Sequence, residues 1–197
     1  DDNNLDYSLN ETVASAYGLL KYSGDRLAAV FGARYEDTRN TARGRRQVDG
    51  IWTNTSNSGS YSDLLPSITM NYSLSEAVKL RGALSKSLGR VPFNAIAPVG
   101  ESLTEDGSII TLTRSNPDLL PRRANNFDLA VDWYFGEGRG LFSTSLFYKE
   151  VKNEFFKAVS SQMIDFDGRQ VEATVSQSMN SGSPVDIKGV EFNLIRE

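Results

Sequence analysis

Apolar and polar residues alternate along most of this chain with a period of two, which predicts β-strands rather than helices. Residues 126–135 give the clearest example. One face of that run would carry Phe127, Leu129, Val131, Trp133 and Phe135. The opposite face would carry Asp128, Ala130, Asp132 and Tyr134. Such a strand separates an apolar environment from a polar one.

The predicted strands are long, and their spacing follows a repeated order. They lie at residues 11–22, 26–38, 61–73, 77–90, 125–135 and 141–155, and a seventh begins at Lys188. Short turns join them in pairs at residues 23–25, 74–76 and 136–140, and long polar connections separate the pairs at residues 39–60, 91–124 and 156–187. This order is typical of an outer-membrane barrel. A soluble sandwich usually has shorter strands and loops of mixed length.

The strand length agrees with a membrane span. About eleven residues rise about 36 Å at roughly 3.3 Å each. With a tilt of about 40° they cover about 28 Å, enough to cross an apolar band roughly 25 Å tall. We therefore predict an all-β fold: an antiparallel up-and-down meander that is a segment of a large transmembrane β-barrel. Its apolar face would meet lipid, and its charged face would meet a water-filled lumen.

Aromatic residues near the strand ends fit the interfacial girdles of such a barrel. They are Tyr22, Tyr35, Tyr72, Trp133, Tyr134 and Tyr148. No apolar run reaches the roughly 18 residues that a transmembrane helix needs, so strands would make the span.

Composition narrows the range of functions. The 197 residues include no cysteine and no histidine, which excludes disulfides, thiolate metal sites and catalysis built on Ser-His or Cys-His pairs. We expect no enzyme activity, no catalytic residue, no bound metal and no cofactor. The net charge is −4 and the basic residues are scattered. A nucleic-acid-binding protein would show a basic stripe instead, so we expect no nucleic-acid partner.

A series of short motifs carries a family resemblance. They are Tyr-Ser-Asp-Leu-Leu-Pro-Ser at 61–67, Leu-Arg-Gly-Ala-Leu-Ser-Lys-Ser at 80–87, Arg-Val-Pro-Phe at 90–93, Asn-Pro-Asp-Leu-Leu-Pro at 116–121, Asn-Phe-Asp-Leu at 126–129, Trp-Tyr-Phe at 133–135 and Phe-Tyr-Lys-Glu-Val-Lys-Asn at 147–153. Together they resemble the barrel strands of TonB-dependent outer-membrane receptors, and most closely the subgroup of Xanthomonas- and Caulobacter-like bacteria. The resemblance covers residues 60–155. Val91 splits the family's Arg-Pro pair, and these residues include neither a plug domain nor a TonB box.

The resemblance implies a place in the bacterial outer membrane, in contact with its lipid, and a role in energised import. The family's barrel has about 22 strands. Residues 1–197 would form part of one barrel domain with about seven strands, and the plug and the other strands would lie outside the chain. In the family, a scarce ligand binds the extracellular loops and the plug, and the TonB complex pulls on the plug. The subgroup favours an oligosaccharide as ligand, with a ferric siderophore next.

Two regions supply candidate ligand contacts. The connection 39–60 holds Arg43, Arg45, Arg46, Trp52 and Asn54. Tryptophan stacks on sugar rings and asparagine hydrogen-bonds their hydroxyls, whereas arginines suit an anionic siderophore. The lumen face of the strands adds Arg81, Asp128 and Asp132. The two aspartates would lie about 13 Å apart, too far to serve as a glycosidase pair.

Within connection 156–187, Asp167-Gly168 is a strong signal for a two-residue hairpin. Residues 162–166 and 169–175 would therefore pair as strands. A calcium loop would need further carboxylates, so we expect no calcium there.

Two alternatives to an import receptor remain open: a soluble β-rich carbohydrate-binding module and a passive porin-type barrel. Detergent-dependent folding would separate a barrel from the soluble module. The isolated chain would expose unpaired edges at residues 11–22 and 188–196, and we expect it to aggregate for that reason.

Overall fold

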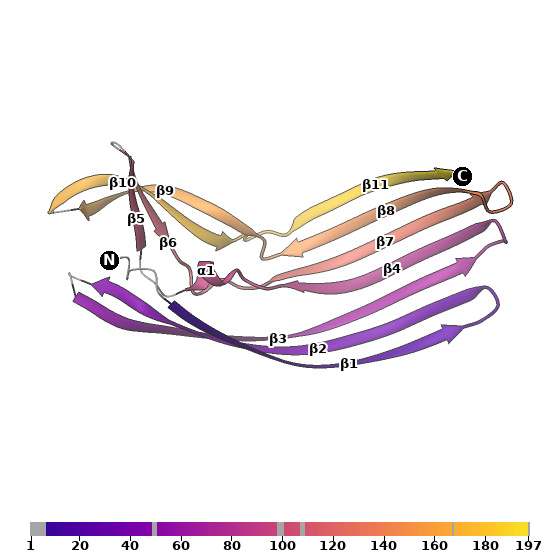
Figure 1. Cartoon of the computed structure of the whole chain (residues 1–197), viewed down its shortest axis with the longest axis horizontal. Helices are drawn as coiled ribbons and strands as arrows, with labels where there is room; N and C mark the ends of the chain where they lie inside the picture. The colour runs from indigo at the N-terminus through magenta and orange to yellow at the C-terminus, as the bar shows by residue number, and fades with distance from the viewer. Residues whose placement is uncertain (1–6, 49–50, 98–100, 107–108, 167, 197) are drawn as a thin grey trace.

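The structure is a computed structural model, and it describes residues 7–48, 51–97, 101–106, 109–166 and 168–196. These residues form eleven strands and one short helix (Figure 1). In chain order the elements are β1 (Tyr7–Ser23), β2 (Leu27–Val48), β3 (Ile51–Ser73), β4 (Val78–Gly89), α1 (Phe93–Ile96), β5 (Glu101–Asp106), β6 (Ile109–Arg114), β7 (Arg122–Phe135), β8 (Gly140–Lys152), β9 (Phe155–Phe166), β10 (Arg169–Asn180) and β11 (Val185–Arg196). No helix in this described part is long and apolar enough to cross a membrane.

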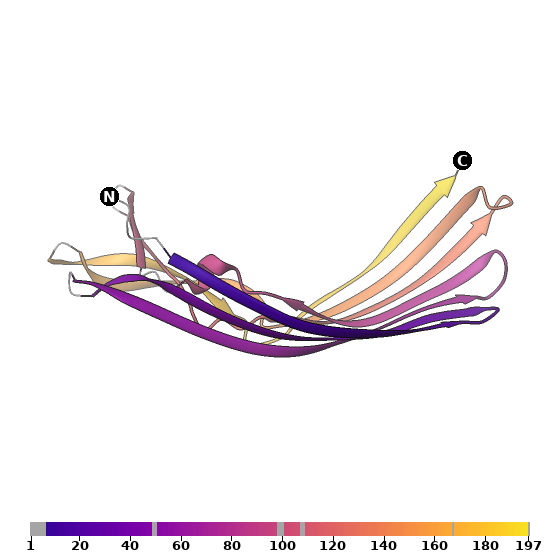
Figure 2. The same ribbon diagram turned by 60° about the horizontal axis from the view of Figure 1, so that its bottom comes forward.

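Seven strands form one antiparallel sheet in the order β1-β2-β3-β4-β7-β8-β11. The chain leaves this sheet twice, between β4 and β7 and between β8 and β11. Both excursions leave from the end opposite the short turns (Figure 1). Figure 2 shows that the sheet is strongly curved and that α1 lies on its concave side. The predicted all-β antiparallel meander is therefore confirmed.

Side chains alternate between the two faces of this sheet along β1, β2 and β3. β2 pairs with β1 and with β3 in a register without a skipped residue, so no bulge reverses the faces. On one face Phe31 and Tyr35 are 45% and 49% exposed, whereas Glu36 on the other is 8% exposed. Arg90, which follows β4, donates a hydrogen bond to Glu36. The Glu36 face is therefore the concave one that α1 and its neighbours cover, and the Phe31 face is convex.

The convex face carries a continuous apolar band. Its large exposed side chains are Leu20, Tyr22, Phe31, Tyr35, Leu64, Met70, Tyr72, Leu84, Phe127, Leu129, Val131, Trp133, Phe142, Leu146, Tyr148, Val190, Phe192 and Leu194. On β2 the band runs from Leu27 to Tyr35, about 26 Å at roughly 3.3 Å per residue. Soluble monomers rarely expose apolar patches above a few hundred Å². A band of this extent therefore needs an apolar surrounding.

Aromatic rings mark both edges of the band. Tyr22, Tyr72 and Trp133 lie near the short turns, and Tyr35 and Tyr148 lie at the opposite edge. The prediction that Tyr134 joins them is wrong. It lies on the concave face, where the Lys79 ammonium sits 5.2 Å from its ring centre. Alternation along β7 requires this, because its neighbour Trp133 is on the convex face.

Residues 39–60, predicted as a long connection, instead continue β2 and β3. The two strands stay paired as far as Val48 and Ile51. The hydroxyls of Thr41 and Ser58 lie 3.2 Å apart across the pair. Both faces are polar here, so the contrast that marks a half-apolar strand is lost from the sequence. The last strand also differs from its prediction, since β11 begins at Val185 rather than Lys188.

The two excursions join in a second sheet, with the order β5-β6-β10-β9. β9 and β10 form the predicted hairpin, although Asp167 lies outside the described residues. Gly168 has a φ of +73°, and its N–H donates to Asp165 Oδ1 at 3.0 Å. β6 pairs with β10 in parallel, with Leu112 opposite Val175 and both side chains buried. The excursions are therefore one structural unit.

A lysine in the apolar band should destabilise the fold more than a lysine on the concave face. We expect Leu129→Lys to lower the free energy of unfolding by about 2–4 kcal/mol, because its ammonium group would face hydrocarbon. Ser145→Lys is the matched control, because Ser145 is concave and lies opposite Glu191. Urea unfolding of the full-length gene product in lipid vesicles, followed by the gel mobility of unboiled samples, measures both. Equal losses would contradict the assignment of the convex face to lipid.

Candidate functional site

Ion pairs line the concave face, and the first one joins neighbouring strands near the short turns. Asp132 of β7 is 3% exposed. Arg81 of β4 approaches its carboxylate to 2.6 Å, and Ser143 of β8 donates to it at 2.6 Å. The register places Asp132 directly opposite Lys79 and Ser143, within reach of Arg81 on the diagonal. These partners offset the cost of burying the carboxylate.

A second group lies midway along the long strands. In β2, Arg34 Nε lies 2.5 Å from Glu36 Oε1. Arg90 donates a hydrogen bond to the other carboxylate oxygen of Glu36. Arg90 lies 3.8 Å from Glu11 of β1 as well. Since Arg90 follows directly after β4, these contacts hold the start of the first excursion against β1 and β2.

A third ion pair joins β3 to β7. Arg123 makes two hydrogen bonds to Asp63, at 2.5 and 3.2 Å. This paired geometry suits a guanidinium and a carboxylate, and it fixes direction as well as distance. Asp63 is 9% exposed, so the Arg123 charge compensates a carboxylate that is largely removed from water.

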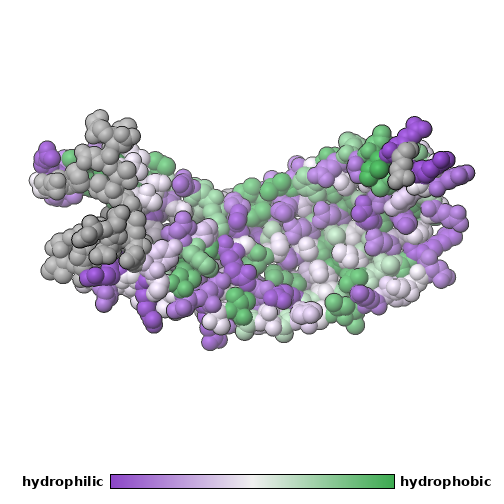
Figure 3. Space-filling view, in the orientation of Figure 1, coloured by the Kyte–Doolittle hydropathy of each residue, from purple (hydrophilic) through white to green (hydrophobic). Residues whose placement is uncertain are grey.

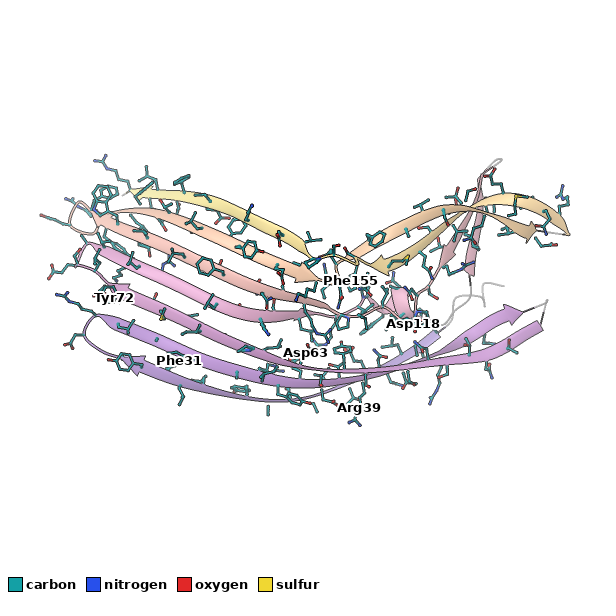
Figure 4. The ribbon with its side chains drawn as sticks, turned by 180° about the vertical axis from the view of Figure 1, so that it is seen from behind. Phe31, Arg39, Asp63, Tyr72, Asp118 and Phe155 are labelled. Atoms are coloured by element: carbon teal, nitrogen blue, oxygen red, sulfur yellow. The ribbon has the colours of Figure 1, made fainter. Side chains whose placement is uncertain are left out.

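Residues 90–97 and 115–121 form a strap across the concave face, away from the short turns (Figure 2). Its small apolar core consists of Val91, Ile96 and Leu119, packed against Leu9, Ala95 and Phe155. The Asn57 amide of β3 donates to the Pro117 carbonyl at 3.2 Å. Figure 4 shows Asp118 beside α1 and Asp63 on β3. The ion pairs and the apolar core together keep the strap on the sheet.

Between the strap and β2–β3 lies a hollow of about 380 Å³. Its lining includes Asn40, Asn57, Tyr61, Val91, Asp118 and Leu119. The amides and the phenol offer hydrogen-bond donors and acceptors without charge. The aliphatic side chains offer an apolar wall. Arg123, which also borders the hollow, is held by Asp63.

The structure brings together three of the predicted site residues. Arg81 and Asp132 line one concave hollow of about 420 Å³ near the short turns. Arg81 and Asp128 line a neighbouring one of about 370 Å³. Asp128 is exposed, in contrast to the ion-paired Asp132. Figure 3 shows hydrophilic residues spread over the sheet and gathered at the short-turn end.

The remaining predicted residues lie elsewhere. Arg43, Arg45 and Asn54 are exposed at convex positions of the β2–β3 extension, around an open hollow of about 520 Å³. The side chains of Arg46 and Trp52 lie outside the described residues. The predicted set is therefore divided between two opposite faces.

Sequence reasoning missed the residues that surround the strap, namely Asn40, Asn57, Tyr61, Arg90 and Arg123. One signal was available. Residues 57, 59 and 61 continue the concave register of Asp63 along β3, so a longer predicted strand would have placed them in the lumen. The residues next to Arg90 and Arg123 in the sequence do not indicate their roles, because their partners Glu36 and Asp63 are distant in the chain.

The arrangement of the concave face suits ligand binding. The described residues contain no group of three acidic side chains that could hold a metal ion. What the concave face offers is a set of fixed amides, hydroxyls and ion-paired charges around open hollows. Such groups select a ligand by hydrogen bonds and shape.

Comparison with known proteins assigns the fold. Residues 1–196 match a family described as TonB dependent receptor-like, beta-barrel. None of the curated proteins matches the chain. Among solved structures, the hemophore receptor HasR of Serratia marcescens, solved with its hemophore HasA and heme, is similar with a TM-score of 0.71 and 19% identity over 93% of this chain. The siderophore receptor PirA of Pseudomonas aeruginosa has a TM-score of 0.62 and 12% identity over 95%.

The ferric-catecholate import receptor Fiu of E. coli K12 is similar too, with a TM-score of 0.60 and 15% identity over 98% of this chain. This chain covers 31% of HasR, 40% of PirA and 26% of Fiu. It therefore spans well under half the length of these proteins. At such identities the likeness shows the fold alone.

Removing Arg81 should cost more stability than removing the charge of its partner. Arg81→Met would leave Asp132, whose side chain is 5% exposed, with Ser143 as its remaining close donor. We expect a loss of about 2 kcal/mol. Asp132→Asn should cost about half as much, because the half-exposed Arg81 regains water. Urea unfolding of both single variants and the double variant of the full-length gene product measures this. A larger loss for Asp132→Asn would contradict it.

Proposed function

The chain belongs to the TonB-dependent receptor β-barrel family, and from that premise we propose that it forms part of the wall of an importer for a scarce ligand. The apolar convex band lies in the lipid of the bacterial outer membrane. The short turns face the periplasm, and the strap and the second sheet face the cell exterior. The single observation that carries the proposal is the hydrogen-bonding hollow between the strap and the concave face, at the end of the sheet away from the short turns. In the proposed barrel this hollow would lie at the extracellular mouth of the lumen.

We further propose that residues 1–197 are part of one barrel domain whose plug and remaining strands lie outside this chain. β1 and β11 are the outer strands of the described sheet. In a closed barrel each would pair with a further strand of the same domain. The TonB complex would act through the plug, as the family resemblance implies.

An oligosaccharide is the ligand class that we favour. On the concave face, Arg34, Arg81, Arg90 and Arg123 each pair with a carboxylate. Their charge is therefore largely compensated before a ligand arrives. The hollow beneath the strap offers neutral amides, the Tyr61 phenol and the acidic Asp118. Such a lining suits neutral hydroxyl-rich molecules better than anionic ones.

An iron-carrying ligand is the second candidate. The titles of similar structures name heme, siderophores and ferric catecholates. Most such ligands are anionic, so they would need positive charge from loops or a plug outside this chain. The family match favours either importer over a passive pore or a soluble module.

Charge reversal at Asp118 discriminates between these two ligand classes. In the full-length receptor, Asp118→Lys should weaken the binding of a neutral oligosaccharide about 5-fold or more, since the acceptor carboxylate is lost. The same change should strengthen the binding of an anionic ferric catecholate. Calorimetric titration of the purified receptor with a panel of maltooligosaccharides, xylooligosaccharides, heme and ferric enterobactin measures both.

Glu137→Lys is the matched control, because Glu137 is exposed in the turn between β7 and β8, at the opposite end of the strands. It should leave all affinities unchanged. Binding of none of the oligosaccharides, together with tight binding of an iron complex, would overturn the preference for a sugar. If every ligand bound and Asp118→Lys changed none of the affinities, the hollow beneath the strap would not be a ligand-binding site.

A further inference from the structure

The second sheet ends in an open edge at β9. In the order β5-β6-β10-β9 this strand is outermost, and within the described part of the chain β10 is its one strand partner. Its register with β10 runs from Phe155 to Phe166 without a skipped residue, so no bulge twists the edge away. Between Lys157 and Asp165 the strand contains neither a charged residue nor a proline. Natural sheets usually protect an exposed edge with such features, so β9 is open to pairing with a further strand.

The side chains of β9 are accessible on both faces beside this edge. Val159 and Met163 lie on one face and are 65% and 63% exposed. Ser161, which lies between them, is exposed as well. On the other face Ser160 and Gln162 are also exposed. A strand added at this edge would therefore remove apolar surface of two large side chains from water.

The sequence of β9 is complementary to itself when it is read in the opposite direction. Taken about Ser161, an antiparallel copy places Lys157 opposite Asp165 and Val159 opposite Met163. Each of these pairs occurs twice, because a two-fold axis repeats it. Opposite charges and apolar side chains that lie directly across an antiparallel ladder both stabilise it. A slip of one residue in either direction would place both charges opposite uncharged residues, so the charges specify the register.

We propose that β9 pairs with β9 of a second copy of this chain, in an antiparallel register centred on Ser161. The two four-stranded sheets would then join into one. A second copy is the occupant because it supplies the complementary charges and the apolar side chains at the required spacing.

The direction of β9 determines how the two copies would be oriented. Figure 1 shows β9 running away from the short turns. Because the paired strands are antiparallel, the short-turn ends of the two copies would point in opposite directions. This is the arrangement of two receptors in facing outer membranes, with the contact between their extracellular faces. The inference uses the barrel orientation of the proposed function, but no particular imported ligand.

Cysteine cross-linking tests the register. In the full-length receptor, Ser161→Cys would place two thiols at the two-fold axis, with Cα atoms about 5 Å apart. Thr174→Cys is the matched control, because Thr174 is exposed on β10 directly opposite Ser161. Its two copies would lie about 14 Å apart, beyond the reach of a disulfide. On a non-reducing gel of the oxidised receptor in detergent, Ser161→Cys should give about 10-fold more cross-linked dimer than Thr174→Cys. Equal yields would overturn the proposal.

Charge reversal distinguishes a second copy from a different partner. In the Ser161→Cys background, Lys157→Asp alone or Asp165→Lys alone would oppose like charges at both ends of the pair. Each should lower the yield of cross-linked dimer about 5-fold. An equimolar mixture of the two variants should restore the yield, because each mixed pair again opposes a carboxylate to an ammonium group. Glu137→Lys, in the turn between β7 and β8, is the control and should leave the yield unchanged.

Asp165 also accepts a hydrogen bond from the Gly168 N–H in the turn of its own hairpin. Damage to this turn would persist in the mixture, so recovery separates pairing from a damaged hairpin, and unboiled gel mobility checks that each variant is folded. No recovery in the mixture would overturn the proposal, and so would an unchanged yield in both single variants. None of these measurements involves an imported ligand, so their failure would leave the proposed function standing.

Discussion

Every backbone N–H and C=O group within the hydrocarbon layer must find a partner in a neighbouring strand, and the rest of this structure depends on that constraint. The seven main strands meet it with long antiparallel registers, and that of β2 has no skipped residue. An uninterrupted register also preserves the alternation of side chains, so a single sheet can present an apolar convex face and a polar concave face. The division between lipid and lumen follows from hydrogen bonding and a period of two.

The concave face can carry charged side chains because the lumen it would line is filled with water. Carboxylates such as Asp132 and Asp63 are largely buried, yet each has an arginine within 2.6 Å. Arg123 lies where the chain rejoins the sheet, and Arg90, which pairs with Glu36, lies where the chain leaves it. The ion pairs therefore hold the strap over the concave face. The parallel pairing of β6 with β10 adds a second constraint, because it joins the two excursions through backbone hydrogen bonds.

The sequence predicts the parts of the fold in which the two faces differ in polarity. Phe127 to Trp133 on β7 and Arg81 with Asp132 on the polar side were recognisable for that reason. The β2–β3 extension was not, because both of its faces are polar and Arg43 therefore looked like a loop residue. Had the strand been extended in the prediction, alternation would have placed Arg43 on the convex face.

Long-range features could not be predicted from the sequence in the same way. The pairing of β6 with β10 and the contacts of Arg90 and Arg123 join residues that are distant in the chain. The strap packs through Val91, Ile96 and Leu119, which come from two segments separated in the chain and so form no local pattern. The hollow beneath it, and the role of Asn57 and Tyr61, depend on that packing rather than on any motif.

Spin labels on β7 test the central division between lipid and lumen most directly. The chain has no cysteine, so single cysteines at 127, 129 and 131, and at 128 and 130, introduce unique labelling sites in it. In the full-length receptor in vesicles, collision with oxygen reports lipid and collision with a nickel chelate reports water. We predict high oxygen accessibility at the odd positions and high nickel accessibility at the even ones. A profile without alternation, or one with the two sets exchanged, would contradict the account.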